Sequence, residues 1–117
     1  MVMYALVRAD LSMTAGKAAS QAGHAFLDAY LHAAPEQIKT YLAQGGTKVV
    51  LTVPHEQALC AAYYQARMAK LPCALVIESQ HVMPPAFDGS PIATAVGIGP
   101  VTRTQAKAIT RGFRLMK

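Results

Sequence analysis

The sequence predicts an α/β fold: a small mixed β-sheet of four or five strands with helices on both faces, in a single domain spanning 1–117. Its 117 residues suffice for one hydrophobic core but not for two. Apolar residues make up 53% of the chain, which excludes a disordered tail and provides material for that core. Short β-branched segments alternate with longer helical ones, and the crossovers that this order requires give a mixed sheet.

The chain begins with a predicted strand and a long helix. Tyr4 to Leu11 starts as an apolar run, as a mostly buried strand would. Ser12 and Thr14 are both candidate N-caps for the alanine-rich helix predicted from Ala15 to Ala34. Gly23 costs this helix roughly 1 kcal/mol relative to alanine, so we expect the helix to approach the sheet closely there.

A short helix and a second strand follow. Pro35 suits a first helical turn, and the helix predicted over Glu36 to Gln44 ends at Gly45 and Gly46, which can adopt left-handed conformations. Lys48 to Val53 is β-branched and apolar, which predicts a strand.

The middle of the chain is predicted to form a third helix and a third strand. Between His55 and Ala69, apolar side chains recur at spacings of three and four and give one buried stripe. Cys73 to Ile77 is short, branched and apolar, which is typical of a central strand, and Glu78 ends it. The prolines and the Asp-Gly pair in Ser79 to Pro91 indicate a long connection with turns and no regular element.

The last part of the chain is predicted to form a strand, a helix and a short final strand. Ile92 to Ile98 is apolar and branched, as a buried strand would be. Thr102 and Gln105 have capping-box spacing and open a helix that reaches about Arg111. The tail from Phe113 to Met116 is expected to add an edge strand.

Composition excludes several classes of protein. Cys60 and Cys73 match neither a disulfide framework nor a zinc-ligand spacing, so we interpret them as buried free thiols and expect no metal. The longest apolar runs are far shorter than the roughly 20 residues of a membrane span, and no signal peptide is recognisable. We therefore expect a cytoplasmic protein without a membrane segment.

The net charge of +5 is concentrated near the C-terminus. No acidic residue follows Asp88, whereas five basic residues do: Arg103, Lys107, Arg111, Arg114 and Lys117. Such a cluster indicates a polyanionic partner such as nucleic acid. A solvated basic face is the alternative, and it is at least as common for a cluster taken alone.

The long helix carries a polar stripe at spacings of four, three and four, formed by Lys17, Gln21, His24 and Asp28. Lys17 lies in the first turn, where the positive end of the helix disfavours a cation, so stability alone does not account for it. The alternatives are an ordinary surface lysine, and for His24 a half-buried side chain that makes one structural hydrogen bond.

Two further residues are candidates because of their places on strands. Glu78 lies at the carboxyl end of a strand, where α/β folds form ligand crevices, although it could be a plain strand-ending acid. Thr94 offers a fixed hydroxyl, although threonine is also an ordinary strand former. Gly97-Ile98-Gly99-Pro100 lacks the third glycine of a dinucleotide loop, so no nucleotide cofactor is expected.

Two segments near the start of the chain form an ordered motif: Arg8-Ala9-Asp10-Leu11-Ser12-Met13 and Gly16 to Ala25. In order and spacing they resemble the pattern R-x-D-L-x-M…G-K-x-A-x-Q-x-x-H-A of type 2 peptidyl-tRNA hydrolases. The likeness continues through Gly45 to Val53, Leu71-Pro72 and Thr94 to Pro100. It therefore covers nearly the whole chain.

The resemblance implies a small mixed sheet flanked by helices, commonly in a homodimer. It also implies hydrolysis, without a metal or other cofactor, of the ester that joins a peptide to tRNA. Lys17, His24 and Thr94 match proposed active-site groups of the family, and Glu78 stands where the family has an aspartate. Gln21 is expected to contact the substrate.

The chain departs from the family pattern after the third strand. Where the family has A-G-x-T after its aspartate, this chain reads Ser79-Gln80-His81-Val82. The first family threonine is thus missing, and Ser79 or His81 are candidate replacements. An insertion around Met83 to Phe87 also lengthens the loop.

The working hypothesis is ester hydrolysis by water in a cleft at the strand ends. Glu78 would orient or deprotonate the water, Lys17 would stabilise the oxyanion, and Thr94 would hold water or substrate. Three spaced cations, Arg103, Lys107 and Arg111, would contact tRNA phosphates. Two alternatives remain: a non-hydrolytic RNA-binding or protein-interaction module of the same fold, and a hydrolase of another acyl substrate.

Overall fold

The main sheet has five strands in the order β3-β6-β1-β2-β7. The computed structural model describes residues 1–79, 82–83 and 87–117, with only the backbone described at 82–83. The strands of the main sheet are β1 (Val2–Arg8), β2 (Lys48–Val53), β3 (Cys73–Glu78), β6 (Ile92–Val101) and β7 (Arg114–Leu115). β1 and β2 are parallel and the other neighbouring pairs are antiparallel, so the predicted mixed sheet is confirmed.

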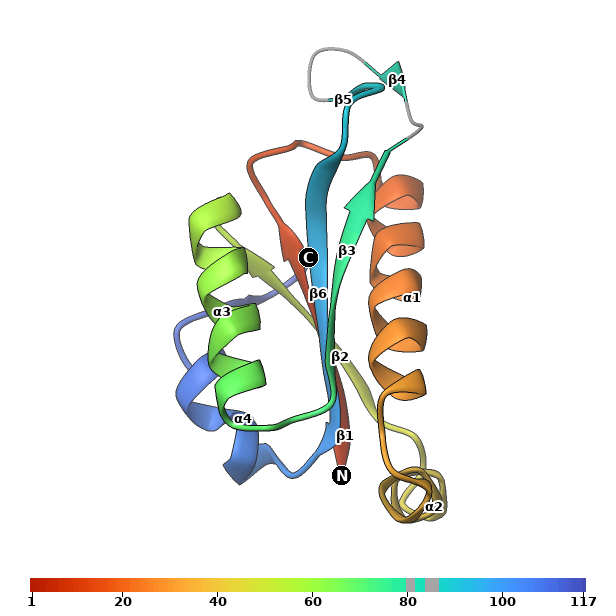
Figure 1. Cartoon of the computed structure of the whole chain (residues 1–117). Helices are drawn as coiled ribbons and strands as arrows, with labels where there is room; N and C mark the ends of the chain where they lie inside the picture. Colours follow the sequence, from red (N-terminus) through yellow and green to blue (C-terminus); the bar gives the residue numbers. More distant parts are fainter. Residues whose placement is uncertain (80–81, 84–86) are drawn as a thin grey trace.

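Helices cover both faces of this sheet, as predicted (Figure 1). They are α1 (Ala15–Leu31), α2 (Pro35–Ala43), α3 (Glu56–Met68) and α4 (Arg103–Thr110). α1 packs on one face, where alanines at 18, 22 and 25 meet buried residues of β1, β3 and β6. α3 and α4 pack on the other face over a larger apolar core. Small side chains on α1 let it lie close to the sheet.

The close approach of α1 to the sheet occurs at Gly97 of β6, and the expectation for Gly23 is wrong. A Cβ at residue 97 would lie 1.9 Å from the backbone oxygen of Ala25. A Cβ at residue 23 would meet nothing within 4 Å, and Gly23 is exposed. The glycine that permits the contact belongs to the strand, so the helix sequence alone could not indicate it.

The third strand is an edge strand, which corrects the prediction of a central one. β3 pairs with β6 on one side and ends the sheet on the other. Its apolar composition has a different cause: α1 and α3 both contact it, one on each face. Ile77, near its end, is 49% exposed.

Two short strands lie in the predicted loop from Ser79 to Pro91. β4 (Val82–Met83) and β5 (Phe87–Asp88) form a separate two-stranded antiparallel sheet at the top of Figure 1. Strands of two residues are too short for sequence periodicity to reveal. Gln80, His81 and 84–86 lie outside the described residues, and so does most of the expected insertion.

Several element ends differ from those predicted. The first strand ends at Arg8 and not at Leu11, because a turn closes there with the Ser12 amide bonded to the Ala9 carbonyl. The long helix ends at Leu31, three residues earlier than expected. The capping box of Thr102 and Gln105 is confirmed.

The two cysteines are free, but only Cys73 is buried, so the prediction for Cys60 is wrong in its burial. Burial raises the pKa of the Cys73 thiol. Within the described residues, no helix is long and apolar enough to cross a membrane.

Candidate active site

The ammonium of Lys17 and the carboxylate of Glu78 lie 3.3 Å apart at one end of the sheet. The Thr14 hydroxyl caps α1 by accepting from the Lys17 amide, which fixes the first turn and the start of the Lys17 side chain. Glu78 is the last residue of β3. Their side chains are 12% and 21% exposed, so the pair is partly shielded from water yet accessible. The expected convergence of these two groups is confirmed.

Gln21 links Glu78 to Thr94 through both ends of its amide. Its Nε2 donates to Glu78 Oε2 at 3.3 Å, and its Oε1 accepts from the Thr94 hydroxyl at 2.6 Å. Gln21 and Thr94 are both fully buried. Their polar groups therefore bond each other beneath the ion pair, and they fix the orientation of the carboxylate.

Phe87 of β5 covers the other side of Lys17. The Lys17 Nζ lies 5.2 Å from the centre of the Phe87 ring, a distance suited to a cation–π contact. Phe87 is 2% exposed, although it belongs to a two-residue strand. Lys17 thus lies between an aromatic face and a carboxylate. Sequence reasoning missed Phe87, because a lone phenylalanine in a proline-rich segment gives no signal of its neighbour.

Arg8 is bonded to Asp10 and to the strand that carries Thr94. Its guanidinium makes two hydrogen bonds to Asp10, at 3.0 and 2.8 Å, and a third to the carbonyl of Ala93 at 2.9 Å. Ala93 precedes Thr94, so this contact fixes the start of β6 beside the site. The hydrogen bonds from Arg8 lower the pKa of Asp10, and the same pairing raises the pKa of Arg8. Sequence reasoning included this pair in the family motif but gave it no role.

His24 follows Lys17 on the same helix but is exposed. Seven residues of helix separate them by about 10 Å along the axis. Its side chain makes no hydrogen bond to the described residues, so the alternative of a half-buried structural histidine does not apply. The candidate replacement Ser79 is also exposed, and His81 lies outside the described residues.

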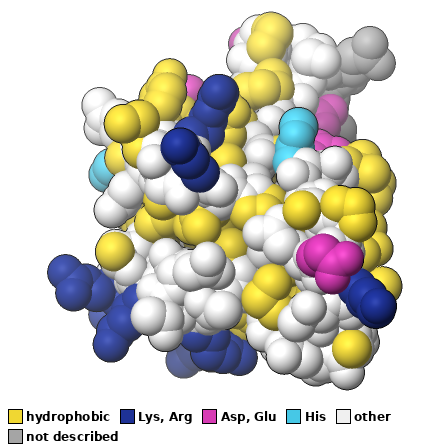
Figure 2. Space-filling model, turned by 60° about the horizontal axis from the view of Figure 1, so that its bottom comes forward, with side chains coloured by type: hydrophobic (Ala, Val, Ile, Leu, Met, Phe, Trp, Pro, Cys, Tyr) yellow, Lys and Arg dark blue, Asp and Glu magenta, His cyan; other side chains and the backbone are white. Residues whose placement is uncertain are grey.

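α4, which carries Arg103 and Lys107 and is followed directly by Arg111, lies at the opposite end of the sheet from Lys17 and Glu78 (Figure 1). Arg103, Lys107 and Arg111 are all exposed. Thr94 and Val101 are seven residues apart along β6, or about 23 Å, and α4 begins beyond Val101. Figure 2 shows basic side chains gathered along the lower left of that end. The structure therefore separates these cations from the ion pair.

Comparisons with known proteins all indicate one family. The family model described as Peptidyl-tRNA hydrolase PTH2 matches residues 1–116. A protein named peptidyl-tRNA hydrolase from Methanocaldococcus jannaschii is 34% identical over 119 residues, covering 99% of this chain and 100% of its own.

Two other relatives carry the same name. The protein from Methanococcus vannielii is 35% identical, covering 95% of each chain, and that from Pyrobaculum aerophilum is 32% identical, covering 95% of this chain and 93% of its own. Because the model and these relatives match the chain nearly from end to end, it belongs to the peptidyl-tRNA hydrolase PTH2 family.

Proposed function

We propose that this chain hydrolyses the ester between peptide and tRNA in peptidyl-tRNA, with Lys17 and Glu78 as its catalytic residues. The observation that carries the proposal is the 3.3 Å contact between their charged groups in a partly exposed site. A carboxylate and an ammonium side by side can carry out the two tasks of ester hydrolysis: the carboxylate activates water, and the ammonium stabilises the oxyanion.

The reaction proceeds through direct attack by water. Glu78 accepts a proton from the water as its oxygen bonds to the ester carbon, and Lys17 donates hydrogen bonds to the negative carbonyl oxygen. The bond from carbon to the ribose oxygen then breaks. That oxygen takes the proton back from Glu78, so free tRNA and the peptide carboxylic acid leave, and the acid then loses its proton to solvent water. Neither cysteine takes part.

Three other residues assist this reaction. Gln21 and Thr94 orient Glu78 through the hydrogen bonds described above, so we assign Gln21 a positioning role in place of substrate contact. His24, about 10 Å further along α1, contacts the acceptor end of the tRNA. The cations of α4 bind phosphates of the same tRNA at the far end of the sheet, which an extended substrate can span.

We also assign the protein to the cytoplasm, where translation supplies peptidyl-tRNA, and propose that it forms a homodimer. The homodimer is supported by large apolar side chains that the single chain leaves in water, such as Leu27 at 56% and Leu42 at 58% exposure. Sedimentation of the purified protein at several concentrations measures its state. Sedimentation as a monomer at every concentration would contradict the proposed homodimer.

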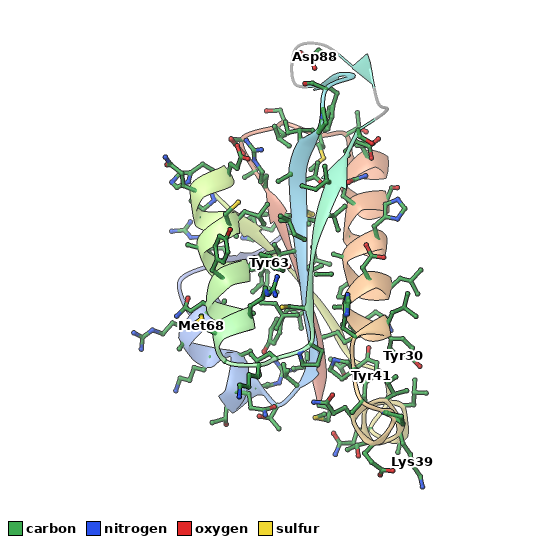
Figure 3. All side chains as sticks on the ribbon, in the orientation of Figure 1. Tyr30, Lys39, Tyr41, Tyr63, Met68 and Asp88 are labelled. Carbon is green, nitrogen blue, oxygen red and sulfur yellow. The ribbon has the colours of Figure 1, made fainter. Side chains whose placement is uncertain are left out.

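The experiment is hydrolysis of a purified peptidyl-tRNA by Lys17→Ala and Glu78→Gln, each with a matched control. We expect each variant to lose about 100-fold or more in kcat, because each removes a group that acts in the transition state. The exposed residues Lys39 and Glu36 of α2 supply the controls, as Lys39→Ala and Glu36→Gln. Figure 3 shows Lys39 at the far lower end of the molecule.

The possible results separate the candidate functions. Normal turnover in Lys17→Ala contradicts the role of the ammonium. Wild-type protein that binds peptidyl-tRNA but releases no peptide supports the non-hydrolytic module. Cleavage of small acyl esters without cleavage of peptidyl-tRNA supports a hydrolase of another substrate.

A further inference from the structure

A groove runs along the free edge of β3, on the side away from β6. Its floor is Leu71–Leu75, one wall includes Asp28 and Leu31 of α1, and the other includes Tyr63 and Arg67 of α3. The volume of this β3 groove is about 820 Å³. Figure 3 shows Tyr63 between α3 and β3. The two helices lie on opposite faces of the sheet, so the edge strand lies at the bottom of a channel between them (Figure 1).

The edge of β3 presents backbone groups to this groove in an alternating pattern. The Gly99 amide donates to the carbonyl of Pro72, the residue before β3, so the backbone of Pro72 faces β6 one step before the pair of Cys73 and Ile98. In antiparallel strands, residues whose backbone faces the neighbouring strand alternate with residues whose amides and carbonyls point outward. Cys73 and Leu75 therefore direct their backbone N–H and C=O groups into the groove. An extended chain placed there can bond to both.

The β3 groove leads toward the ion pair. Leu75 is three residues from Glu78 along β3, a separation of about 10 Å. Asp28 in the α1 wall is seven residues from Gln21, again about 10 Å along the helix. The exposed Ile77 lies between the groove and Glu78 on the same strand. The β3 floor and the α1 wall of the groove therefore both lead toward the ion pair of Lys17 and Glu78.

We propose that the β3 groove binds the peptide part of the substrate as an added strand beside β3. The proposal rests on the proposed function, because peptidyl-tRNAs differ in peptide sequence and need recognition that ignores side chains. Hydrogen bonds to an edge strand meet this need, since they use only the peptide backbone. The walls offer charges of both signs, Asp28 against Arg67, and therefore do not favour one class of side chain.

The chemistry fixes the direction and the reach of the bound peptide. Its carbonyl end must lie at Glu78, which is the C-terminal end of β3, so the peptide runs parallel to β3. At about 3.3 Å per residue, the last two or three residues of the peptide span the distance from Glu78 to Leu75. Residues further from the ester then lie in the groove itself. Peptides of one or two residues do not reach it.

The first test measures KM for one tRNA carrying N-acetylated peptides of one to six residues. We expect KM to fall about tenfold between two and five residues, because two or more backbone hydrogen bonds are gained. A second series places one N-methyl group at each amide of the five-residue substrate in turn. Only alternate positions should raise KM, because a strand bonds its neighbour through every second residue.

The second test changes the protein. Leu75→Pro removes an outward amide and leaves the pairing with β6 intact, and an edge strand tolerates proline at such a position. We expect this variant to lose the tenfold KM advantage, so that the five-residue and two-residue substrates have about equal KM values. Leu75→Ala, which keeps the amide but loses the side chain, should retain the advantage, and thermal melting verifies that both variants are folded.

Each contrary result has a definite meaning. Hydrolysis with equal KM for one and five residues, or a methylation series without alternation, overturns the β3 groove as the peptide site. A wild-type dimer that Leu75→Pro dissociates, with the length advantage unchanged, assigns the groove to a second copy and also overturns the proposal. Failure to hydrolyse any of these substrates overturns the proposed function instead.

Discussion

Gln21 illustrates how a single residue can connect the core to the site. It lies on the polar stripe of α1 that the sequence reveals, yet it is fully buried and bonds Thr94 and Glu78. Spacing on a helix identifies residues on one face, but it does not say which of them the sheet covers. The sequence therefore indicated Lys17 and Gln21 as candidates on one face of the helix, and only the packing of α1 on β3 and β6 separates the buried Gln21 from the accessible Lys17.

Gln21→Met tests this positioning role. We expect kcat to fall about tenfold with little change in KM, because Glu78 loses a hydrogen bond while the substrate contacts remain. In a Glu78→Gln background the same substitution should have no further effect on kcat. Gln65→Met, at an exposed glutamine of α3, is the control. An equal loss in both backgrounds shows a general structural effect and contradicts the role.

Asp10 gives a prediction for stability against pH. Its hydrogen bonds from Arg8 lower its pKa in the folded state, below the ordinary value of about 3.9. Its contribution to stability is therefore complete above about pH 4 and is lost as the pH falls through the folded value. Urea unfolding of wild type and Asp10→Asn should differ most above pH 4 and converge in stronger acid. A difference that stays constant from pH 2 to 7 contradicts this assignment.

At the scale of elements, the contact of α1 with β6 depends on one missing methyl group. Gly97→Ala would place a carbon 1.9 Å from the Ala25 backbone oxygen, so we expect a loss of about 3 kcal/mol or more in unfolding free energy. Gly23→Ala, on the exposed side of the same helix, should gain about 0.5–1 kcal/mol. Urea unfolding measures both. Equal effects of the two substitutions contradict this account of the packing.

The elements differed in how well the sequence predicted them. Strands and helices with strong periodicity, such as Lys48–Val53 of β2, were found with their observed ends. The position of β3 at the edge of the sheet was not predicted, because helices on both faces give an edge strand the apolar composition of a central one. The β4–β5 pair was missed because strands of two residues are too short to show a periodic pattern, and because the contact of Phe87 with Lys17 joins residues far apart in the sequence.

At the scale of the whole molecule, the site and the basic helix lie at opposite ends of the sheet. Replacing Arg103, Lys107 and Arg111 by alanine should raise KM and leave kcat unchanged, because their proposed role is to bind tRNA phosphates far from the reacting ester. The plot of log KM against log salt concentration should become less steep by about 2–3, near 0.7–0.9 for each lost contact. Lys39→Ala combined with Lys48→Ala is the control on another surface. An unchanged slope in the α4 variant contradicts phosphate binding there.

The measurement that tests the central claim most directly is the single-turnover cleavage of peptidyl-tRNA by Lys17→Ala, Glu78→Gln and the double variant. If the two residues act as one unit, each single variant loses about 100-fold or more, and the double variant is no slower than the slower single one. Losses that multiply in the double variant would mean that the two groups act independently. A wild-type rate in either single variant would contradict the assignment of the site.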